Sequence, residues 1–274
     1  MIPPFSFAVA PRRPFRYIRP VLLAVDIGNT NVVFGLFRGA DLVGDYRIAT
    51  PPRSTPDEAG LSITHFLMRH RIEPARVEKV VIASVVPHLT PVFERTSRRY
   101  LSREPLTVSC RLKLPIAIRI ESPDQVGADR IANAVAALAR WGGPAIVVDL
   151  GTATTFDVLD AAQAYIGGVI IAGPEAAMAE LARRAARLFE VRIEKPDTVV
   201  GKSTAGALKS GAFYGLIGQV DFIIDRIIEE CGFDRCKVAA TGGLAFEIEG
   251  HSRHITEVVP SLTLEGLRII GEGN

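Results

Sequence analysis

The sequence has few cysteines and almost no excess of charge of either sign. Its three cysteines, Cys110, Cys231 and Cys236, cannot form a disulfide framework for 274 residues, and they indicate a reducing cytoplasm. Cys231 and Cys236 have no second cysteine pair or nearby histidine pair, so no zinc site is expected. The net charge of +2 gives no support for a nucleic-acid or membrane-surface protein.

Long hydrophobic runs are also absent, because no apolar stretch approaches the roughly 18 residues that a membrane span needs. With 48% hydrophobic and 23% charged residues, the chain has an ordinary globular composition. This composition excludes a disordered, collagenous or coiled-coil protein as a description of the whole chain. The length predicts one large domain or two modest ones, at about 150 residues per domain.

Residues 1–20 differ from the rest, with five prolines, four arginines and no acidic residue. The prolines prevent an amphipathic helix, and the positive charge follows the apolar residues, whereas a signal peptide has the reverse order. We expect residues 1–20 to be a disordered or loosely attached extension without a targeting role.

Beyond residue 20 the hydrophobic pattern alternates between a strand-like and a helix-like period. Apolar runs bounded by turn residues predict strands at 21–26, 31–37, 42–48, 79–86, 145–150, 154–159, 165–171, 237–240 and 258–259. Periodic segments with capping residues predict helices at 55–70, 91–101, 127–141, 174–188, 203–231 and 261–270. Thr55 is the expected N-cap of the first helix, because Pro56 follows at the first helical position and the acidic residues Asp57 and Glu58 fall in the first turn.

An internal repeat is the most informative feature. Asp26-Ile27-Gly28-Asn29-Thr30 matches Asp149-Leu150-Gly151-Thr152-Ala153-Thr154, and the two aspartates are 123 residues apart. Each copy is a strand, an acidic residue, a glycine, polar side chains and a second strand. Two such halves predict a two-lobed molecule with both Asp-Gly turns facing a cleft.

These turns have the chemistry of a phosphate site. Glycine at the bend lets another group approach backbone N–H donors, and Asn29, Thr30 and Asn31 add neutral donors, so a triphosphate can bind without a lysine. An aspartate at a strand end can hold Mg²⁺, usually through water. The alternative is that each motif is only a favourable β-turn, and the second copy at half-chain spacing argues against it.

A second candidate lies at the start of the helix over 127–141. Asp129 falls in its first turn, where the helix dipole favours a carboxylate, and Arg130 beside it could clamp an anionic substrate group. On pattern alone, an ordinary helix start is the favoured explanation of Asp129. Gly201-Lys202-Ser203 is not a Walker P-loop, because the required earlier glycine is Pro196, and no Rossmann G-x-G-x-x-G follows a strand. We expect Lys202 to be solvated.

Together these motifs resemble the type III pantothenate kinases, which belong to the acetate kinase, sugar kinase, Hsp70 and actin superfamily. The resemblance covers about residues 21–270 and rests on five segments in order: Asp26-Ile27-Gly28-Asn29-Thr30, Gly127-Ala128-Asp129-Arg130, Asp149-Leu150-Gly151-Thr152-Ala153-Thr154-Thr155, Gly201-Lys202-Ser203-Thr204 and Thr241-Gly242-Gly243-Leu244-Ala245. It implies an α/β fold of two ribonuclease H-like lobes, each with a three-stranded meander, a mixed sheet and helices, around an ATP cleft. The lobes would be residues 21–143 and 144–274.

The implied activity is transfer of the ATP γ-phosphoryl group to pantothenate, the first step of coenzyme A synthesis, by a cytoplasmic homodimer. The residues implied to bind ATP are Asp26, Ile27, Gly28, Asn29, Thr30, Asn31, Val32, Val33 and Thr152. The residues implied to bind pantothenate are Gly127, Ala128, Asp129, Arg130 and Thr204, with Asp129 as the catalytic base and the pocket at the subunit interface. Asp26 would hold Mg²⁺, Asp149 would hold K⁺ or NH₄⁺, and Gly242 and Gly243 would lie near the adenosine.

Two positions depart from the family pattern. Ile120 stands where many members have tyrosine, so a substrate contact is missing or supplied elsewhere, and Gly173-Pro174 replaces the usual Pro-Gly. Two alternatives to a working pantothenate kinase remain: a catalytically silent relative with a regulatory role, and another small-molecule kinase of the superfamily. Asp129 discriminates against the silent relative, which should have lost it.

Overall fold

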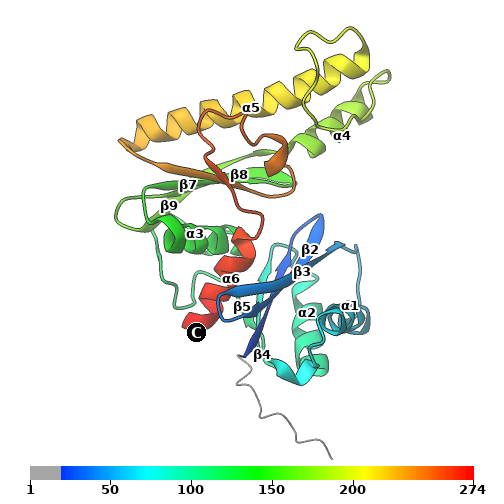
Figure 1. Cartoon of the computed structure of the whole chain (residues 1–274), viewed down its shortest axis with the longest axis vertical. Helices are drawn as coiled ribbons and strands as arrows, with labels where there is room; N and C mark the ends of the chain where they lie inside the picture. Colours follow the sequence, from blue (N-terminus) through cyan, green and yellow to red (C-terminus); the bar gives the residue numbers. More distant parts are fainter. Residues whose placement is uncertain (1–19) are drawn as a thin grey trace, which may run out of the picture.

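Two mixed β-sheets carry the fold in the computed structural model, which describes residues 20–274 (Figure 1). Residues 1–19 lie outside the described part of the chain, and with them nearly all of the extension expected at 1–20. The first sheet has the strand order β3-β2-β1-β4-β5, and the second has the order β11-β10-β7-β8-β9-β6.

The first sheet starts with a meander. Its strands are β1 (Val21–Ile27), β2 (Asn31–Arg38), β3 (Asp41–Ala49), β4 (Val77–Ser84) and β5 (Leu106–Thr107). β2 is antiparallel to both β1 and β3, and β4 pairs with β1 in parallel. A short two-residue strand, β5, extends the parallel side and was not predicted from the sequence.

The second sheet repeats this plan. Its strands are β6 (Ala117–Ile118), β7 (Ala145–Leu150), β8 (Ala153–Leu159), β9 (Ala164–Ala172), β10 (Lys237–Thr241) and β11 (Glu257–Val258). β7, β8 and β9 form an antiparallel meander, and β10 pairs with β7 in parallel, as β4 does with β1. The predicted repeat and the two-lobed α/β architecture are therefore confirmed.

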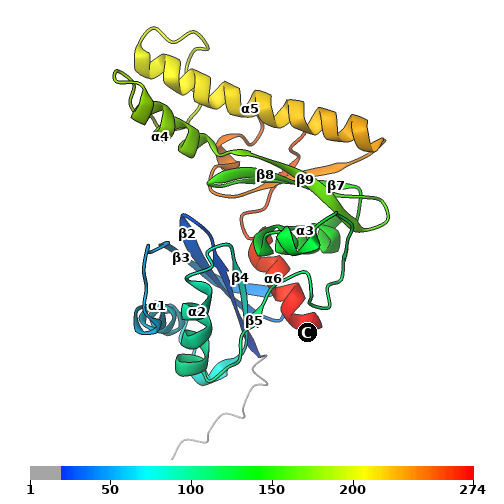
Figure 2. The same cartoon turned by 180° about the vertical axis from the view of Figure 1, so that it is seen from behind.

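Helices lie outside both sheets and between them (Figures 1 and 2). The longer helices are α1 (Pro56–Arg69), α2 (Thr90–Thr96), α3 (Ala128–Trp141), α4 (Pro174–Arg184), α5 (Thr204–Cys231) and α6 (Leu262–Gly273). The first sheet packs on α1 and α2, and the second packs on α5. The middle layer holds α3, which packs against β7 and β8, and α6, which packs against β1 and β4 and against α3 itself. Each half of the chain thus supplies one helix of the layer between the sheets.

The alternation of side chains along β1 and β7 aims both repeat aspartates inward. In β1, Val25 and its odd-numbered neighbours pack under α1 and α2, whereas Ala24 faces the middle layer. In β7, Val148 packs toward α5, whereas Val147 faces the middle layer. Because the side-chain period of a strand is two, the residues after Val25 and Val148 also point toward the space between the sheets. These residues are Asp26 and Asp149.

The helix boundaries follow local signals where those signals are strong. Thr55 accepts a hydrogen bond from the Glu58 N–H at 3.3 Å, and the Thr55 N–H donates to Glu58 Oε2 at 2.7 Å, which confirms the predicted helix start. The helix predicted over 174–188 ends instead at Arg184. Residues 185–192 are mostly exposed, so no packed face stabilises a further turn of helix.

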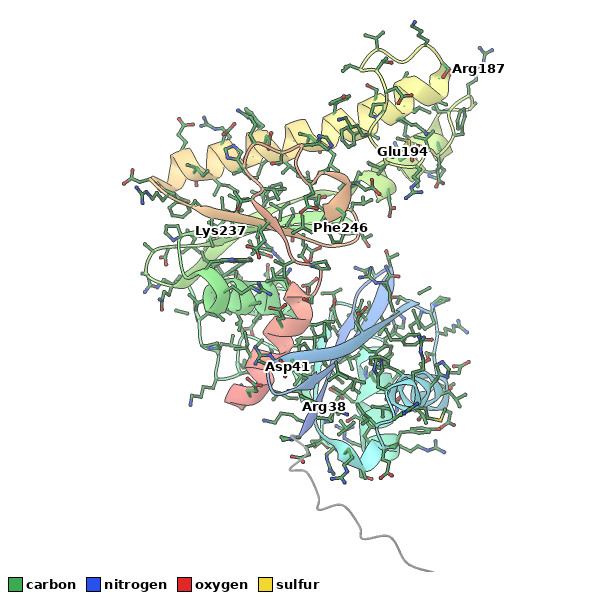
Figure 3. The ribbon with its side chains drawn as sticks, viewed as in Figure 1. Arg38, Asp41, Arg187, Glu194, Lys237 and Phe246 are labelled. Atoms are coloured by element: carbon green, nitrogen blue, oxygen red, sulfur yellow. The ribbon has the colours of Figure 1, made fainter. Side chains whose placement is uncertain are left out.

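The segment that joins α4 to α5 projects from the second lobe. Figure 3 shows Arg187 and Glu194 on it, at the opposite end of the molecule from Arg38 and Asp41 of the first sheet. Glu194 pairs with Lys209 of α5. Across residues 20–274, every helix is too short or too polar to cross a lipid bilayer. The three cysteines are free thiols, as predicted.

Candidate active site

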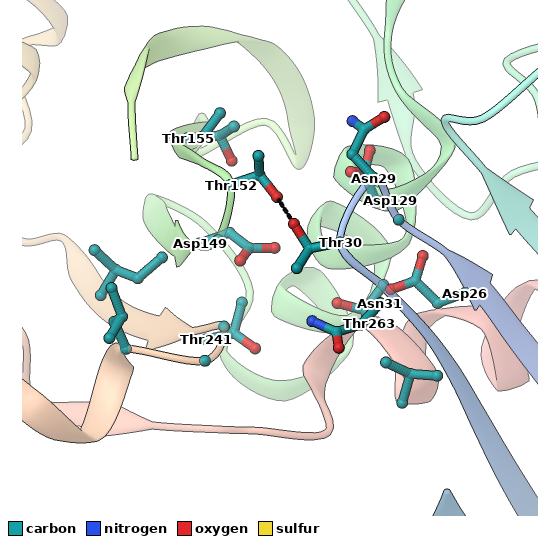
Figure 4. A pocket seen from close by; sticks show the side chains of 18 of the residues that line it. Asp26, Asn29, Thr30, Asn31, Asp129, Asp149, Thr152, Thr155, Thr241 and Thr263 are labelled. Carbon is teal, nitrogen blue, oxygen red and sulfur yellow. Dashed lines mark hydrogen bonds between the residues drawn. The ribbon is translucent and has the colours of Figure 1, made fainter. Parts of the chain in front are cut away.

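The two repeat turns meet at the mouth of a cleft between the lobes. Thr30 lies in the β1–β2 turn and Thr152 in the β7–β8 turn, and their hydroxyl oxygens are 2.6 Å apart (Figure 4). A cavity of about 380 Å³ lies against both turns. The predicted site residues that line it are Asp26, Gly28, Asn29, Thr30, Asn31, Val33, Asp129, Asp149 and Thr152. The structure therefore brings the two copies of the repeat and the start of α3 into one site.

Three recessed carboxylates face this cavity: Asp26, Asp129 and Asp149 (Figure 4). Withdrawal from water and repulsion by Asp129 and Asp149 raise the pKa of Asp26 to about 8. Burial also raises the pKa of Asp149, to about 6, although a hydrogen bond from Asn133 opposes the rise. Three carboxylates that line one cavity repel one another, and a cation that entered the cavity would reduce this repulsion.

Asp149 is held by a chain of hydrogen bonds from the middle layer. The side-chain amide of Asn133, on α3, donates to Asp149 Oδ2 at 3.1 Å. Thr263 Oγ1, on α6, donates in turn to Asn133 Oδ1 at 2.8 Å. Asn133 is fully buried, so this contact fixes the carboxylate against the wall of the cleft. The backbone of Gly242 packs against the other carboxylate oxygen, Asp149 Oδ1. A side chain does not fit at position 242, because a Cβ would lie 2.6 Å from that oxygen and the φ of +92° favours glycine.

Asp129 lies in the first turn of α3, as predicted. Its Oδ1 accepts the Arg130 N–H at 2.8 Å, which uses one of the free donors of the helix start. Glycine at position 127 leaves room for this carboxylate, because a Cβ there would lie 2.4 Å from Asp129 Oδ1. The backbone hydrogen bond and the Arg130 charge lower the pKa of Asp129, but burial dominates and leaves it raised.

The guanidinium of Arg130, which was predicted to bind an anionic substrate group, is already hydrogen-bonded within the protein. Its Nε donates to Asp157 Oδ1 at 2.6 Å and its Nη2 to the Phe156 carbonyl oxygen at 3.3 Å. Tyr165 donates its hydroxyl to the same Asp157 oxygen at 3.2 Å, and Asp157 is fully buried. Asp157 Oδ2 has no hydrogen-bond partner among the described residues. Asp157 and Tyr165 therefore hold the guanidinium in one orientation, and no local motif predicted a role for either residue.

Other implied site residues lie outside the cavity lining. Ile27 and Val32 are fully buried in the core under α1 and α2, so their side chains cannot reach a ligand and only their backbone can contribute. Thr204 is exposed in the first turn of α5. Gly127, Ala128 and Arg130 also do not line the cavity. Lys202 is exposed, as predicted.

The departure at Gly173-Pro174 fits the second turn closely. The Gly173 N–H donates to the Thr152 carbonyl at 3.1 Å, and a Cβ at Gly173 would lie 2.3 Å from the Gly151 carbonyl oxygen. Pro174 then begins α4, where its fixed φ suits the first helical position. This order of the two residues therefore packs the start of α4 directly against the turn.

Sequence reasoning missed several residues that line the cavity: Arg47, Val85, Thr155, Glu175, Thr263 and Leu264. A second cavity, of about 730 Å³, shares Thr30, Thr152 and Gly243 with the first and extends over Ile193 and Arg192. Thr155 ends the second repeat motif, whereas Arg47, Val85, Glu175, Thr263 and Leu264 belong to no motif and reach the cleft through strand register and helix packing.

The donor set suits hard cations together with phosphate. Carboxylate and hydroxyl oxygens are the ligands that Mg²⁺ and K⁺ prefer. Within residues 20–274, no three acidic, histidine or cysteine side chains converge to form a complete metal site. A cation at Asp26 or Asp149 would therefore need further oxygens, from water or from a bound nucleotide.

The internal repeat, the two lobes and the oxygen-lined cleft define a fold class that this chain shares with solved proteins. The activator of 2-hydroxyisocaproyl-CoA dehydratase from Clostridium difficile, solved with bound ADPNP, superposes with a TM-score of 0.53 at 12% identity, over 92% of each chain. A ROK hexokinase from Thermus thermophilus gives a TM-score of 0.51 at 12% identity, over 92% of this chain and 98% of that one. At such identities the likeness shows the fold alone.

The sequence comparisons narrow the class to one family. Residues 22–226 match the family described as type III pantothenate kinase. Over 254 residues the chain is 47% identical to the type III pantothenate kinase of Anaeromyxobacter dehalogenans strain 2CP-C, covering 93% of this chain and 100% of that one. It is 42% identical to the corresponding enzyme of Exiguobacterium sp. strain AT1b, covering 93% and 99%. The chain belongs to the type III pantothenate kinase family.

Proposed function

We propose that this protein transfers the γ-phosphoryl group of ATP to the primary hydroxyl of pantothenate, giving 4′-phosphopantothenate and ADP. The observation that carries the proposal is the convergence of Asp26, Asp129 and Asp149 with two hydroxyl-bearing turns in one cleft. Family membership supplies the substrate class. We assign residues 21–143 and 144–274 to the two lobes around the nucleotide.

In this reaction the pantothenate oxygen forms a bond to the γ-phosphorus while the bond to the β–γ bridging oxygen breaks and ADP leaves. Asp129 takes the proton of the attacking hydroxyl, and its raised pKa suits a general base. The backbone of the turn from Gly28 to Asn31, with the hydroxyls of Thr30 and Thr152, positions the phosphates. Positioning and charge stabilisation account for most of phosphoryl-transfer catalysis.

Two cations belong to the proposal. Asp26 would hold Mg²⁺ with the phosphates, and Asp149 would hold K⁺ or NH₄⁺. The raised pKa values of these two carboxylates support the assignment, because each gains an opposite charge when a cation binds. When bound, the cations supply counter-charge for the carboxylates and for the triphosphate.

The proposed functional unit is a cytoplasmic homodimer whose pantothenate pocket draws Thr204 from the partner subunit. Thr204 is exposed at the start of α5 and does not line the cavity of its own subunit, so the proposal has it contact the pocket of the partner subunit. α5 also carries an exposed face on which Gly211, Gly215 and Gly218 leave open space beside Tyr214 and Phe222. Such a face suits close packing against a second helix.

A coupled assay of ADP release, with and without pantothenate, tests the function directly. We expect ADP release to depend on pantothenate, and mass spectrometry of the product to show one added phosphoryl group. A pantothenate-independent ATPase, or no turnover with stable nucleotide binding, would contradict it. The silent-relative alternative receives no support, because Asp129 stands in the cleft with the other carboxylates.

A further inference from the structure

The charge balance of the cleft is one-sided. Asp26, Asp129, Asp149 and Glu175 line the cavity, and the one basic residue in its lining is Arg47. An ATP triphosphate adds several more negative charges. Arg47 is therefore the one protein cation in the described lining that could meet them.

Strand register explains why Arg47 is there. β2 pairs with β1 so that Val33 is opposite Asp26, and it pairs with β3 so that Val33 is opposite Arg47. Directly opposite residues of antiparallel strands point to the same face of a sheet. Asp26, Val33 and Arg47 therefore form one row across three strands on the inner face, and all three line the cavity.

The Arg47 guanidinium is uncommitted, in contrast to other arginines near the middle layer. Arg130 is paired with Asp157, and Arg140 is paired with Glu265. Arg47 forms no ion pair or side-chain hydrogen bond with any residue from 20 to 274, and it is exposed. Burial raises the pKa of both Asp26 and Asp149, and the positive charge of Arg47 partly opposes this rise.

We propose that Arg47 binds the β- and γ-phosphates of ATP and stabilises the phosphoryl group during transfer. This inference rests on the proposed kinase function. A guanidinium matches two phosphate oxygens at once, and it keeps its charge at any working pH. Arg47 lines the cavity that holds the carboxylates and the two polar turns, but not the second cavity over Ile193 and Arg192, so the proposal places it beside the phosphates.

The test compares Arg47→Gln with Arg47→Lys and with a control, Arg53→Gln. Arg53 is exposed in the segment between β3 and α1 and does not line the cavity, so its replacement removes the same charge from the surface. Steady-state kinetics give kcat and KM for each substrate, and calorimetry gives the affinity for the Mg²⁺ complex of a non-hydrolysable ATP analogue. The thermal unfolding midpoint checks that each variant is folded.

For Arg47→Gln we expect kcat/KM for ATP to fall by about 10²-fold, as for other single transition-state donors. The analogue should bind about tenfold more weakly, and KM for pantothenate should stay within about twofold. Arg47→Lys should fall between wild type and Arg47→Gln, because it keeps the charge and loses the two-pronged geometry. Arg53→Gln should match wild type.

Two results would overturn the proposal. One is an Arg47→Gln variant indistinguishable from Arg53→Gln in nucleotide affinity and turnover. The other is a loss confined to the KM of pantothenate, which would place Arg47 on that substrate's carboxylate. If wild type binds the analogue but does not phosphorylate pantothenate, the kinase proposal fails, and the calorimetric comparison still decides the role of Arg47.

Discussion

The hydroxyl oxygens of Thr30 and Thr152 lie 2.6 Å apart across the cleft, although 122 residues separate them in the sequence. Each belongs to the polar turn that follows a repeat aspartate, so the hydrogen bond joins the two copies of the repeat directly (Figure 4). Either hydroxyl can donate to the other. If a phosphate oxygen replaced this hydrogen bond and accepted from both hydroxyls, the two lobes would share one ligand.

Loss of Asp129 should abolish most turnover. Asp129→Asn removes the proton acceptor and keeps the size of the side chain, so we expect kcat to fall by roughly 10²–10⁴-fold, the usual range for a general base. Affinity for ATP should change little. Asp124→Asn is the matched control, since Asp124 is exposed shortly before the same helix. Turnover within about threefold of wild type would remove Asp129 from the base role.

The pH profile should report the same carboxylate. A base must be ionised, so kcat/KM for pantothenate at saturating Mg²⁺-ATP should fall as pH drops through the pKa of Asp129. Burial raises this pKa, and the fall should therefore begin above the ordinary aspartate value of 3.8. The residual rate of Asp129→Asn should not show this fall at low pH. If kcat/KM fell only at or below pH 3.8, burial would not raise the pKa of Asp129 in the working enzyme.

Activity should depend on the monovalent cation through Asp149. At equal ionic strength, which removes general screening, rates in K⁺ or NH₄⁺ should greatly exceed rates in Na⁺. Asp149→Asn should raise the K⁺ concentration for half-maximal activity and weaken ATP binding, and the K⁺-dependent shift of the unfolding midpoint should shrink. Asp197→Asn, at an exposed position, is the control. Equal rates in all three salts would contradict the assignment.

Asp157 should act on pantothenate through Arg130. Asp157→Asn leaves the Arg130 guanidinium without its charged partner, so we expect KM for pantothenate to rise by about tenfold and stability to fall by about 1–3 kcal/mol. Tyr165→Phe removes only the second hydrogen bond to Asp157 and should have a smaller effect on both. Kinetics and urea unfolding separate the two effects. Destabilisation with an unchanged KM would make Asp157 a structural residue and weaken Arg130 as a substrate contact.

The exposed face of α5 should hold two subunits together. We expect wild type to be a dimer by light scattering at micromolar concentration, and Phe222→Asp to be a monomer, because it puts a charge on an apolar face. The monomer should lose activity if Thr204 completes the partner's pocket. Leu61→Asp on α1 changes an equally exposed apolar residue on the other lobe and should leave the dimer intact. A fully active monomer would contradict both parts of the prediction.

Features that depend on neighbours in the chain could be predicted from the sequence. The helix start at Thr55, the position of Asp129 in a helix start and the two Asp-Gly turns each depend on contiguous residues, and the structure has all of them. Their order along the chain also pointed to the family that the comparisons confirm. Helix ends without a strong stop signal were predicted less well, as at Arg184, because packing rather than sequence ended the helix.

The sequence by itself therefore determined the repeat, the two-lobed class and which turns carry carboxylates and hydroxyls, since these are written in local patterns. Only the tertiary structure decided that Arg47 shares a face with Asp26, because that depends on the register of β1, β2 and β3. It likewise decided that Asn133 anchors Asp149 and that Asp157 holds Arg130. These partners lie on different elements and carry no local motif, so only the packing of α3 between the sheets brings them together.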